Sequence, residues 1–146
     1  MKYSLFRFID ICEITIIYLI CFTSNSIFVY VENLDLESSS ILKSFVESII
    51  NYKFIINILL TFMIVVFHYQ FLNRRKTEIL CRLLVGDTLK RIKIRYIYNN
   101  IIILIFSFLI SLLLNFYINQ DPTSNIYLVT IFITYILFSI GQVKKE

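Results

Sequence analysis

The residues of this chain that could do chemistry in water are gathered in one basic stretch, from Asn73 to Arg95. It holds eight of the fourteen Lys and Arg residues and separates two strongly apolar segments. Two interpretations compete: a cytoplasmic loop that is basic through membrane topology alone, and a helix on which a soluble partner docks. We favour the second. We expect no enzymatic activity, because the apolar segments carry no carboxylate pair, no His cluster and no Ser/Lys dyad.

The sequence offers no recognisable set of metal ligands. Its three cysteines have neither a CxxC nor a Cys/His spacing, and the single histidine, His68, lies in an apolar run with no acid nearby. Small hydrophobic packing is the better interpretation of Cys12, Cys21 and Cys81. We therefore expect this chain to bind no metal and no cofactor.

Composition places the chain in a membrane. Hydrophobic residues make up 58% of its 146 residues, the mean hydropathy is +0.78, and there are only two glycines and one proline. Soluble domains contain about 45–50% apolar residues. The excess lies in blocks of about 18 residues or more, the length that reads as a transmembrane helix. Membrane topology then explains the net charge of +4, and without a binding motif nucleic acid is not an expected partner.

The apolar blocks predict an all-α membrane protein in which residues 1–146 form a single four-helix membrane domain. The predicted spans are 14–31, 54–72, 96–120 and 126–143, with a basic loop over 73–95. The first span is the weakest, because polar residues at 23–26 fall in its second half. We expect them to face another helix, where they can hydrogen-bond. Residues 38–53 have the spacing of an amphipathic helix, which either continues into the second span as a stalk or lies on the outer surface.

Four spans place both termini on one side of the membrane. That side carries twelve Lys and Arg residues and the other only Lys43 and Lys53, so the positive-inside rule puts both termini and the basic loop in the cytoplasm. Asp10 and Glu13 would be costly to bury at the bilayer centre, so we expect them at the interface. On a helix, Asp10 could pair there with Arg7.

The order of residues in the basic stretch predicts a short helix, a sharp turn and a second helix. Glu78 and Arg82 form an i, i+4 pair, and Gly86 stands where a helix end favours a left-handed residue. Asp87 or Thr88 can then cap the next helix. The short helix also carries an apolar stripe, which must pack on the membrane interface or in a partner's groove: Ile79, Leu80, Leu83 and Leu84.

Over these residues the chain resembles the FtsX-like (MacB-type) permeases of ABC transporter complexes. That family carries an Arg-rich entry, Glu-Ile, a small apolar run and a Gly eight residues after the Glu. The matching residues here are Arg74, Arg75, Lys76, Glu78, Ile79 and Gly86, with Lys90 to Ile92 continuing the pattern. The chain departs from the family in a third span poor in glycine. It also has only a short connector, 32–53, where members often carry a large extracytoplasmic domain.

The resemblance implies a coupling helix that docks on a separate cytoplasmic ABC ATPase. That ATPase would bind the ATP, because the chain has no GxxxxGK[ST] loop. It implies a permease subunit of the bacterial cytoplasmic (inner) membrane, paired with a second permease in a homodimer or with a larger partner. Such a subunit couples ATP hydrolysis to export, extraction or signalling of a peptide or lipid-like substrate. The docking residues would be Glu78, Ile79, Leu83 and Gly86, while Arg74, Arg75 and Lys76 would orient the loop against lipid phosphates.

The alternative is a small four-span immunity or accessory membrane protein for a bacteriocin or toxin, with no ATPase coupling. Four short spans and a minimal exterior fit it equally well. The basic loop would then be a topology determinant with an interfacial helix.

Overall fold

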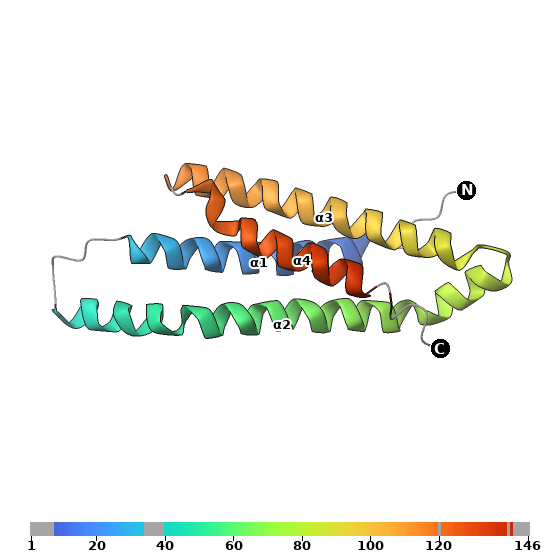
Figure 1. The fold of residues 1–146 in the computed structure, drawn as a ribbon, viewed down its shortest axis with the longest axis horizontal. Coiled ribbons are helices and arrows are strands. Elements are labelled where there is room, and N and C mark those ends of the chain that lie inside the picture. The colour runs from blue at the N-terminus through green and yellow to red at the C-terminus, as the bar shows by residue number, and fades with distance from the viewer. Residues whose placement is uncertain (1–7, 34–39, 120, 140, 142–146) are drawn as a thin grey trace.

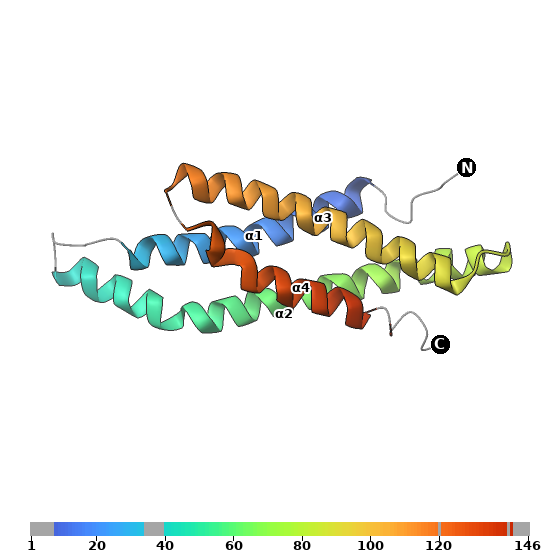
Figure 2. The same cartoon turned by 45° about the horizontal axis from the view of Figure 1, so that its top comes forward.

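The computed structural model describes residues 8–33, 40–119, 121–139 and 141, which form helices and connecting turns with no strand among them (Figure 1). The elements are α1 (Phe8–Glu32), α2 (Ser40–Leu84), α3 (Leu89–Tyr117), the short 3-10 helix η1 (Pro122–Asn125) and α4 (Ile126–Ser139). The all-α prediction is thus confirmed. The start of α1, the turn between α2 and α3, and the end of α4 point toward one end of the bundle, called here the basic end (Figures 1 and 2).

Three of the helices, α1, α2 and α3, are long and apolar enough to cross a membrane. A transmembrane helix needs about 20 residues, and α4 has 14. It runs obliquely from the end of α3 toward α2 (Figures 1 and 2). The structure therefore supports a helical membrane protein; the described part of α4, which ends at Ser139, is shorter than a helix that spans a membrane.

α2 is a single helix of 45 residues. It joins most of the predicted stalk, from Ser40 on, to the second predicted span and to the first half of the basic stretch, up to Leu84. Nothing interrupts it, because the sequence from Ser40 to Val85 contains neither glycine nor proline. The short helix expected within the basic stretch is thus the end of α2. At 1.5 Å per residue α2 is about 67 Å long, so both of its ends project beyond a hydrocarbon layer of about 30 Å.

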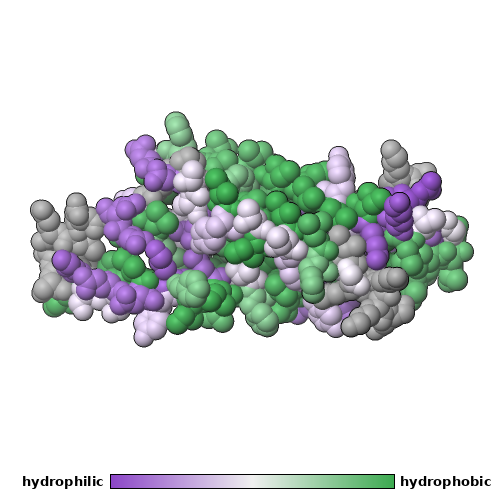
Figure 3. Space-filling model, viewed as in Figure 1, coloured by the Kyte–Doolittle hydropathy of each residue, from purple (hydrophilic) through white to green (hydrophobic). Residues whose placement is uncertain are grey.

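Ion pairs between α1 and α2 mark two levels along the bundle. Near the basic end Arg74 pairs with Glu13 at 2.7 Å, and near the opposite end Lys53 pairs with Glu32. No Asp, Glu, Lys or Arg lies between these levels on either helix. The levels are about 28 Å apart along α1 and about 32 Å apart along α2, close to the thickness of the hydrocarbon layer. In Figure 3 hydrophobic residues cover the middle of the bundle, and hydrophilic residues gather mostly toward its ends.

The bundle is held together by an aromatic core and by buried polar groups. Phe132 lies between Tyr18 and Phe22, with ring centroids 5.2 and 5.7 Å away, and all three side chains are buried. Many large apolar side chains, such as Phe62 and Phe106, are exposed instead. This arrangement suits lipid, where helices gain little from burying apolar surface and associate through packing and interhelical hydrogen bonds.

The prediction for residues 23–26 is confirmed at Asn25 and Ser26, which are buried against η1. Asn25 Nδ2 donates to Asn125 Oδ1 at 2.7 Å and to the Ser124 carbonyl at 3.1 Å. Asn125 Nδ2 donates in turn to the hydroxyl oxygens of Ser26, at 3.0 Å, and of Ser111 on α3, at 2.8 Å. These bonds tie η1 to α1 and α3.

This cluster explains where α4 begins. Asn25 lies seven residues before Glu32 on α1, which places it about 10 Å inside the level of the Lys53–Glu32 pair. Its partners in η1 therefore lie inside the apolar layer as well, and α4 begins there. Backbone that departs from an α-helix at such a depth is tolerated only where the protein satisfies its polar groups. Asn25 does so for the Ser124 carbonyl.

We expect Asn125→Leu to lower the free energy of unfolding in mixed micelles by about 2 kcal/mol, because it removes several interhelical hydrogen bonds worth about 0.6 kcal/mol or more each. The matched control is Asn51→Leu, since Asn51 is exposed on α2 and its replacement should leave stability unchanged. Equal effects of the two substitutions would show that the η1 cluster does not stabilise the fold.

Candidate functional site

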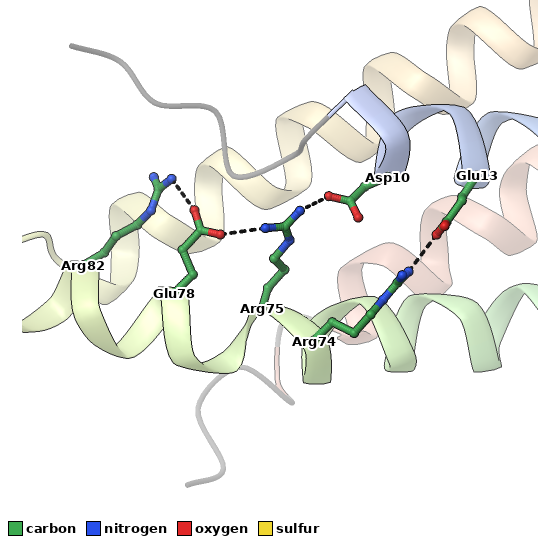
Figure 4. A network of polar contacts seen from close by, with 6 residues as sticks. All are labelled: Asp10, Glu13, Arg74, Arg75, Glu78 and Arg82. Carbon is green, nitrogen blue, oxygen red and sulfur yellow. Dashed lines mark hydrogen bonds and ion pairs between the residues drawn. The ribbon is translucent and has the colours of Figure 1, made fainter.

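At the basic end, α1 and α2 are joined by a connected set of charged side chains (Figure 4). Arg75 is its centre: one guanidinium nitrogen donates to Asp10 on α1 and the other to Glu78, at 2.8 Å, one turn further along α2. Glu78 also accepts from Arg82 at 2.8 Å, which confirms the predicted i, i+4 pair. Glu13 and Arg74 form a separate pair beside this set.

Burial makes the partners of Arg75 necessary. Its side chain is only 8% exposed and that of Asp10 only 9%, so either charge alone would be costly to keep out of water. Its guanidinium also lies 6.0 Å from the centre of the Phe71 ring, a favourable cation–π distance. The three acids and three arginines drawn in Figure 4 compensate each other in charge.

Glu78 lies beyond the apolar part of α2, on the far side of Arg74. Burial of its carboxyl opposes ionisation, but hydrogen bonds from Arg82 and Arg75 outweigh that effect and lower the pKa of the carboxyl below its usual value. The carboxylate is therefore charged at neutral pH and bridges two arginines.

The sequence indicated Arg7 as a partner for Asp10. Arg7 lies outside the described residues, and the structure pairs Asp10 with Arg75, on another helix. The available signal was weak: two acids three residues apart at the start of one apolar helix, and two adjacent arginines at the end of the next. Antiparallel helices bring such groups to the same level, but sequence spacing does not say which faces meet.

The turn between α2 and α3 has the local geometry that its residues predict. Gly86 has φ +100°, its N–H donates to the Leu83 carbonyl at 3.1 Å, and the N–H of Asp87 donates to the Arg82 carbonyl at 3.0 Å. This pattern is a Schellman motif, in which a left-handed glycine ends the helix. Thr88 then caps α3 by accepting from the Arg91 N–H. Both predictions, for Gly86 and for Thr88, are confirmed.

The residues expected to dock a partner divide into two groups. Ile79 is buried in the apolar core, and the half-buried Leu83 packs against that core. Leu80, Leu84 and Val85 point outward instead, with exposed fractions of 49%, 88% and 89%. The outward surface at the end of α2, called here the tip, therefore consists of Leu80, Leu84 and Val85, and Gly86 follows it.

Exposed cations surround the tip. Lys76 is exposed on α2, and Lys90 and Arg91 are exposed on the first turn of α3. Arg95 lies 3.6 Å from the carboxylate of Asp87 across the turn. The last turns of α2 and the first turns of α3 extend past the start of α1 and the end of α4 in both ribbon views (Figures 1 and 2). The projecting end thus combines an apolar tip with a basic surround.

A second polar set, which the sequence did not reveal, contains one residue from each long helix and one from α4. The hydroxyl of Tyr18 lies 2.8 Å from His68 Nε2, and His68 Nδ1 lies 3.2 Å from the hydroxyl of Tyr96. Ser139 Oγ, at the end of α4, donates to the Tyr96 hydroxyl at 3.4 Å. All four side chains are buried. His68 therefore acts as a hydrogen-bonding centre within the bundle.

The two polar sets are linked by packing. The ring of Phe71 stacks on Tyr96, with centroids 6.2 Å apart, and the Arg75 guanidinium lies over the Phe71 ring, 6.0 Å from its centroid. Within the described ranges, no three His, Cys, Asp or Glu side chains gather in a way that could hold a metal ion. The basic end thus presents an apolar tip with cationic surroundings.

No protein-family model, no curated protein and no solved structure matches this chain.

We expect Arg75→Leu to lower the free energy of unfolding by about 3 kcal/mol or more, because it removes one partner of a buried ion pair, Arg75 with Asp10. Arg74→Leu should cost at most about 1 kcal/mol, since the Arg74 side chain is 52% exposed and its pair is screened by water. Titration with a denaturing detergent in mixed micelles measures both. If the two substitutions cost the same, the buried pair is not what holds α1 to α2.

Gly86→Ala should destabilise the turn by about 1 kcal/mol, because a side chain at positive φ is strained. A Cβ at this position would meet no atom within 4 Å, so the cost is conformational and not steric. Gly86→Asn is the matched control, since asparagine tolerates left-handed backbone. Alkylation of exposed Cys81, one turn earlier, reports the order of the helix end. Equal rates in both variants and the wild type would contradict the expectation.

Proposed function

We propose that this chain is the membrane subunit of an ABC-type complex, and that the tip docks on a separate cytoplasmic ATPase. The observation that carries the proposal is the projecting end of α2. Leu84 and Val85 are almost fully exposed there, whereas Ile79 on the same helix is buried. An apolar tip with basic surroundings fits a groove that is apolar at its floor and acidic at its rim.

The length of the projection favours a protein partner over the membrane surface. Leu84 lies ten residues beyond Arg74, about 15 Å of helix. The headgroup region on each side of a bilayer is about 5–8 Å thick. An amphipathic segment that rests on lipid lies within that region. The tip extends further, into the space where a soluble protein binds.

We assign the roles within the proposed coupling helix from the exposure and contacts of its side chains. Under the proposal Leu80, Leu84 and Val85 contact the ATPase, with Gly86 shaping the turn. Ile79 and Leu83 hold this end of α2 on the bundle. Arg75 and Glu78 fix its direction through their ion pairs, and Arg74 adds a surface pair with Glu13. Lys76 is exposed on α2 and faces the lipid phosphates or the partner's rim.

Coupling then uses the continuity of α2. A helix without glycine or proline from Ser40 to Leu84 transmits a displacement of its end along its length. In the proposed complex the basic end faces the cytoplasm of a bacterium, following the positive-inside rule. A second permease, identical or larger, completes the membrane part, and the substrate is a peptide or a lipid-like molecule.

The test asks whether this chain, purified in mild detergent, captures an ABC ATPase whose gene lies beside its own. We expect Leu84→Glu with Val85→Glu to abolish capture, because two charges on the tip cannot enter an apolar groove. The matched control is Phe116→Glu with Tyr117→Glu. These residues are 85% and 87% exposed and lie at the other end of the bundle, so capture should be unchanged.

The alkylation rate of the exposed Cys81 thiol gives an independent measure of docking. Docking should slow its alkylation, while buried Cys21 stays unreactive as evidence that the fold is intact. If no such ATPase is captured while Cys21 remains protected from alkylation, the permease proposal is refuted. The small immunity or accessory protein would then take its place.

A further inference from the structure

α2 has one face toward the bundle and an opposite face that the other helices leave uncovered. On the first face, Asn57 Nδ2 donates to Asn25 Oδ1 of α1 at 3.0 Å, and Ile64 and Phe71 are buried in the core. The opposite face carries a line of side chains at alternating intervals of four and three residues. This line is called here the seam, and it consists of residues 41, 45, 48, 52, 55, 59, 62, 66 and 69. Val66 is half-buried, and the other eight are exposed.

The seam has the pattern of a coiled coil. Its mean interval of about 3.5 residues keeps one line of a helix against a partner when two helices supercoil. The pattern is sustained over four heptads, a length that indicates a coiled coil. Ser48 is its one polar aliphatic residue, and its hydroxyl donates to the Ser44 carbonyl at 2.9 Å, so it brings no unmet donor to the seam. The remaining positions are apolar or aromatic: Ile41, Phe45, Tyr52, Ile55, Leu59, Phe62, Val66 and Tyr69.

The part of the seam outside the hydrocarbon layer is the part that needs a cover, because an apolar face inside the layer can contact lipid. Ile41 and Phe45 precede Lys53 by twelve and eight residues, about 18 and 12 Å of helix beyond the level of the Lys53–Glu32 pair. The headgroup region is about 5–8 Å thick, so both side chains lie in water, where they are 82% and 63% exposed. Both ribbon views show the first turns of α2 extending past the end of α1 (Figures 1 and 2).

The charges of α2 leave the seam open to an identical helix. Lys43, Glu47 and Lys53 are the only Asp, Glu, Lys or Arg residues from Ser40 to Tyr69. All three lie off the seam and off the positions that flank it in a coiled coil. The flanking positions carry uncharged residues throughout: 42, 44, 49, 51, 56, 58, 63 and 65. Two copies therefore bring no like charges together at the seam, where such charges would oppose self-association.

Membrane topology makes a second copy the matching occupant. The occupant has to cover the seam both in water and in lipid, so it is itself a helix that leaves the bilayer at the same level. All copies of this chain share one orientation in the membrane. A twofold axis normal to the membrane then places two α2 helices side by side and parallel, with each seam residue beside its equivalent. α2 thus supplies the helix that its own seam requires.

We propose that two copies of this chain associate through the seams of their α2 helices, as a parallel, left-handed pair that crosses at about 20°. The proposed function needs a second membrane subunit, identical or larger, and the seam makes it an identical one. The association uses the face of α2 opposite the bundle and leaves the tip free. It therefore stands without ATPase docking.

The first test is disulfide formation between chains in lipid vesicles. The chain carries Cys12→Ser and Cys81→Ser, and buried Cys21 is kept so that its resistance to alkylation reports the fold. With a mild oxidant, Ser48→Cys should give a covalent dimer, because equivalent seam residues lie within reach of a disulfide. The matched control is Lys43→Cys, which is exposed at the same end of α2 but on its other side. It should give at least about tenfold less dimer.

The second test measures the monomer–dimer equilibrium in mixed micelles by energy transfer between chains labelled at the C-terminus. Phe45→Glu should weaken association by about tenfold or more, because it places two like charges side by side in the seam. Lys43→Glu puts the same residue on the other side of the helix and should leave association unchanged. Resistance of Cys21 to alkylation again verifies the fold of each variant.

Equal yields of dimer from Ser48→Cys and Lys43→Cys would overturn the proposal, because contact between chains would then not select the seam. A chain that stays monomeric at every ratio of protein to detergent would overturn it as well, in favour of a larger permease as the second subunit. Neither test involves the tip. Loss of ATPase capture with these results intact would refute docking alone, and the reverse outcome would refute only the seam.

Discussion

A hydrocarbon layer has no water to satisfy a polar group, so each polar group that enters it needs a partner within the protein. This constraint organises the whole chain. The ion pairs of Arg74 with Glu13 and of Lys53 with Glu32 lie at the two borders of the apolar segments. Between these borders, the buried amides, hydroxyls and imidazole bond mainly to one another or to the backbone. The apolar side chains, which need no partner, form most of the exterior.

The connected polar groups also give the bundle its specificity. Apolar helices in lipid can slide or rotate against one another at little cost, because no apolar surface is taken from water. Tyr18, His68, Tyr96 and Ser139 remove that freedom near the basic end, and Asn25 and Asn125 remove it near the other end. Phe71 joins the first of these sets to Arg75. A change in the direction of the tip would therefore alter the hydrogen bonds of His68, where four helices meet.

Local features of the structure could be predicted from the sequence, whereas contacts between distant segments could not. Gly86, Thr88 and the Glu78–Arg82 pair act within one or two turns, so their spacing is informative by itself. The apolar blocks likewise identify α1, α2 and α3. The partner of Asp10 is sixty-five residues away, and that of Asn25 one hundred. Such pairs depend on which helix faces meet, and hydropathy in an apolar helix hardly distinguishes one face from another.

The apolar stripe at the end of α2 could not be resolved from the sequence for the same reason. Ile79 is buried in the core and Leu84 is exposed, and which of the two packs inward depends on where the other helices lie.

The short α4 has a consequence for how the chain is made. Its 14 residues begin inside the apolar layer, at an irregular turn that Asn25 and Ser111 satisfy. Before those partners are in place, the exposed backbone of η1 would be costly to insert. Insertion of the segment from Pro122 to Ser139 would therefore be favoured once α1 and α3 are side by side. During biosynthesis α1 and α3 would thus form the template onto which this segment closes.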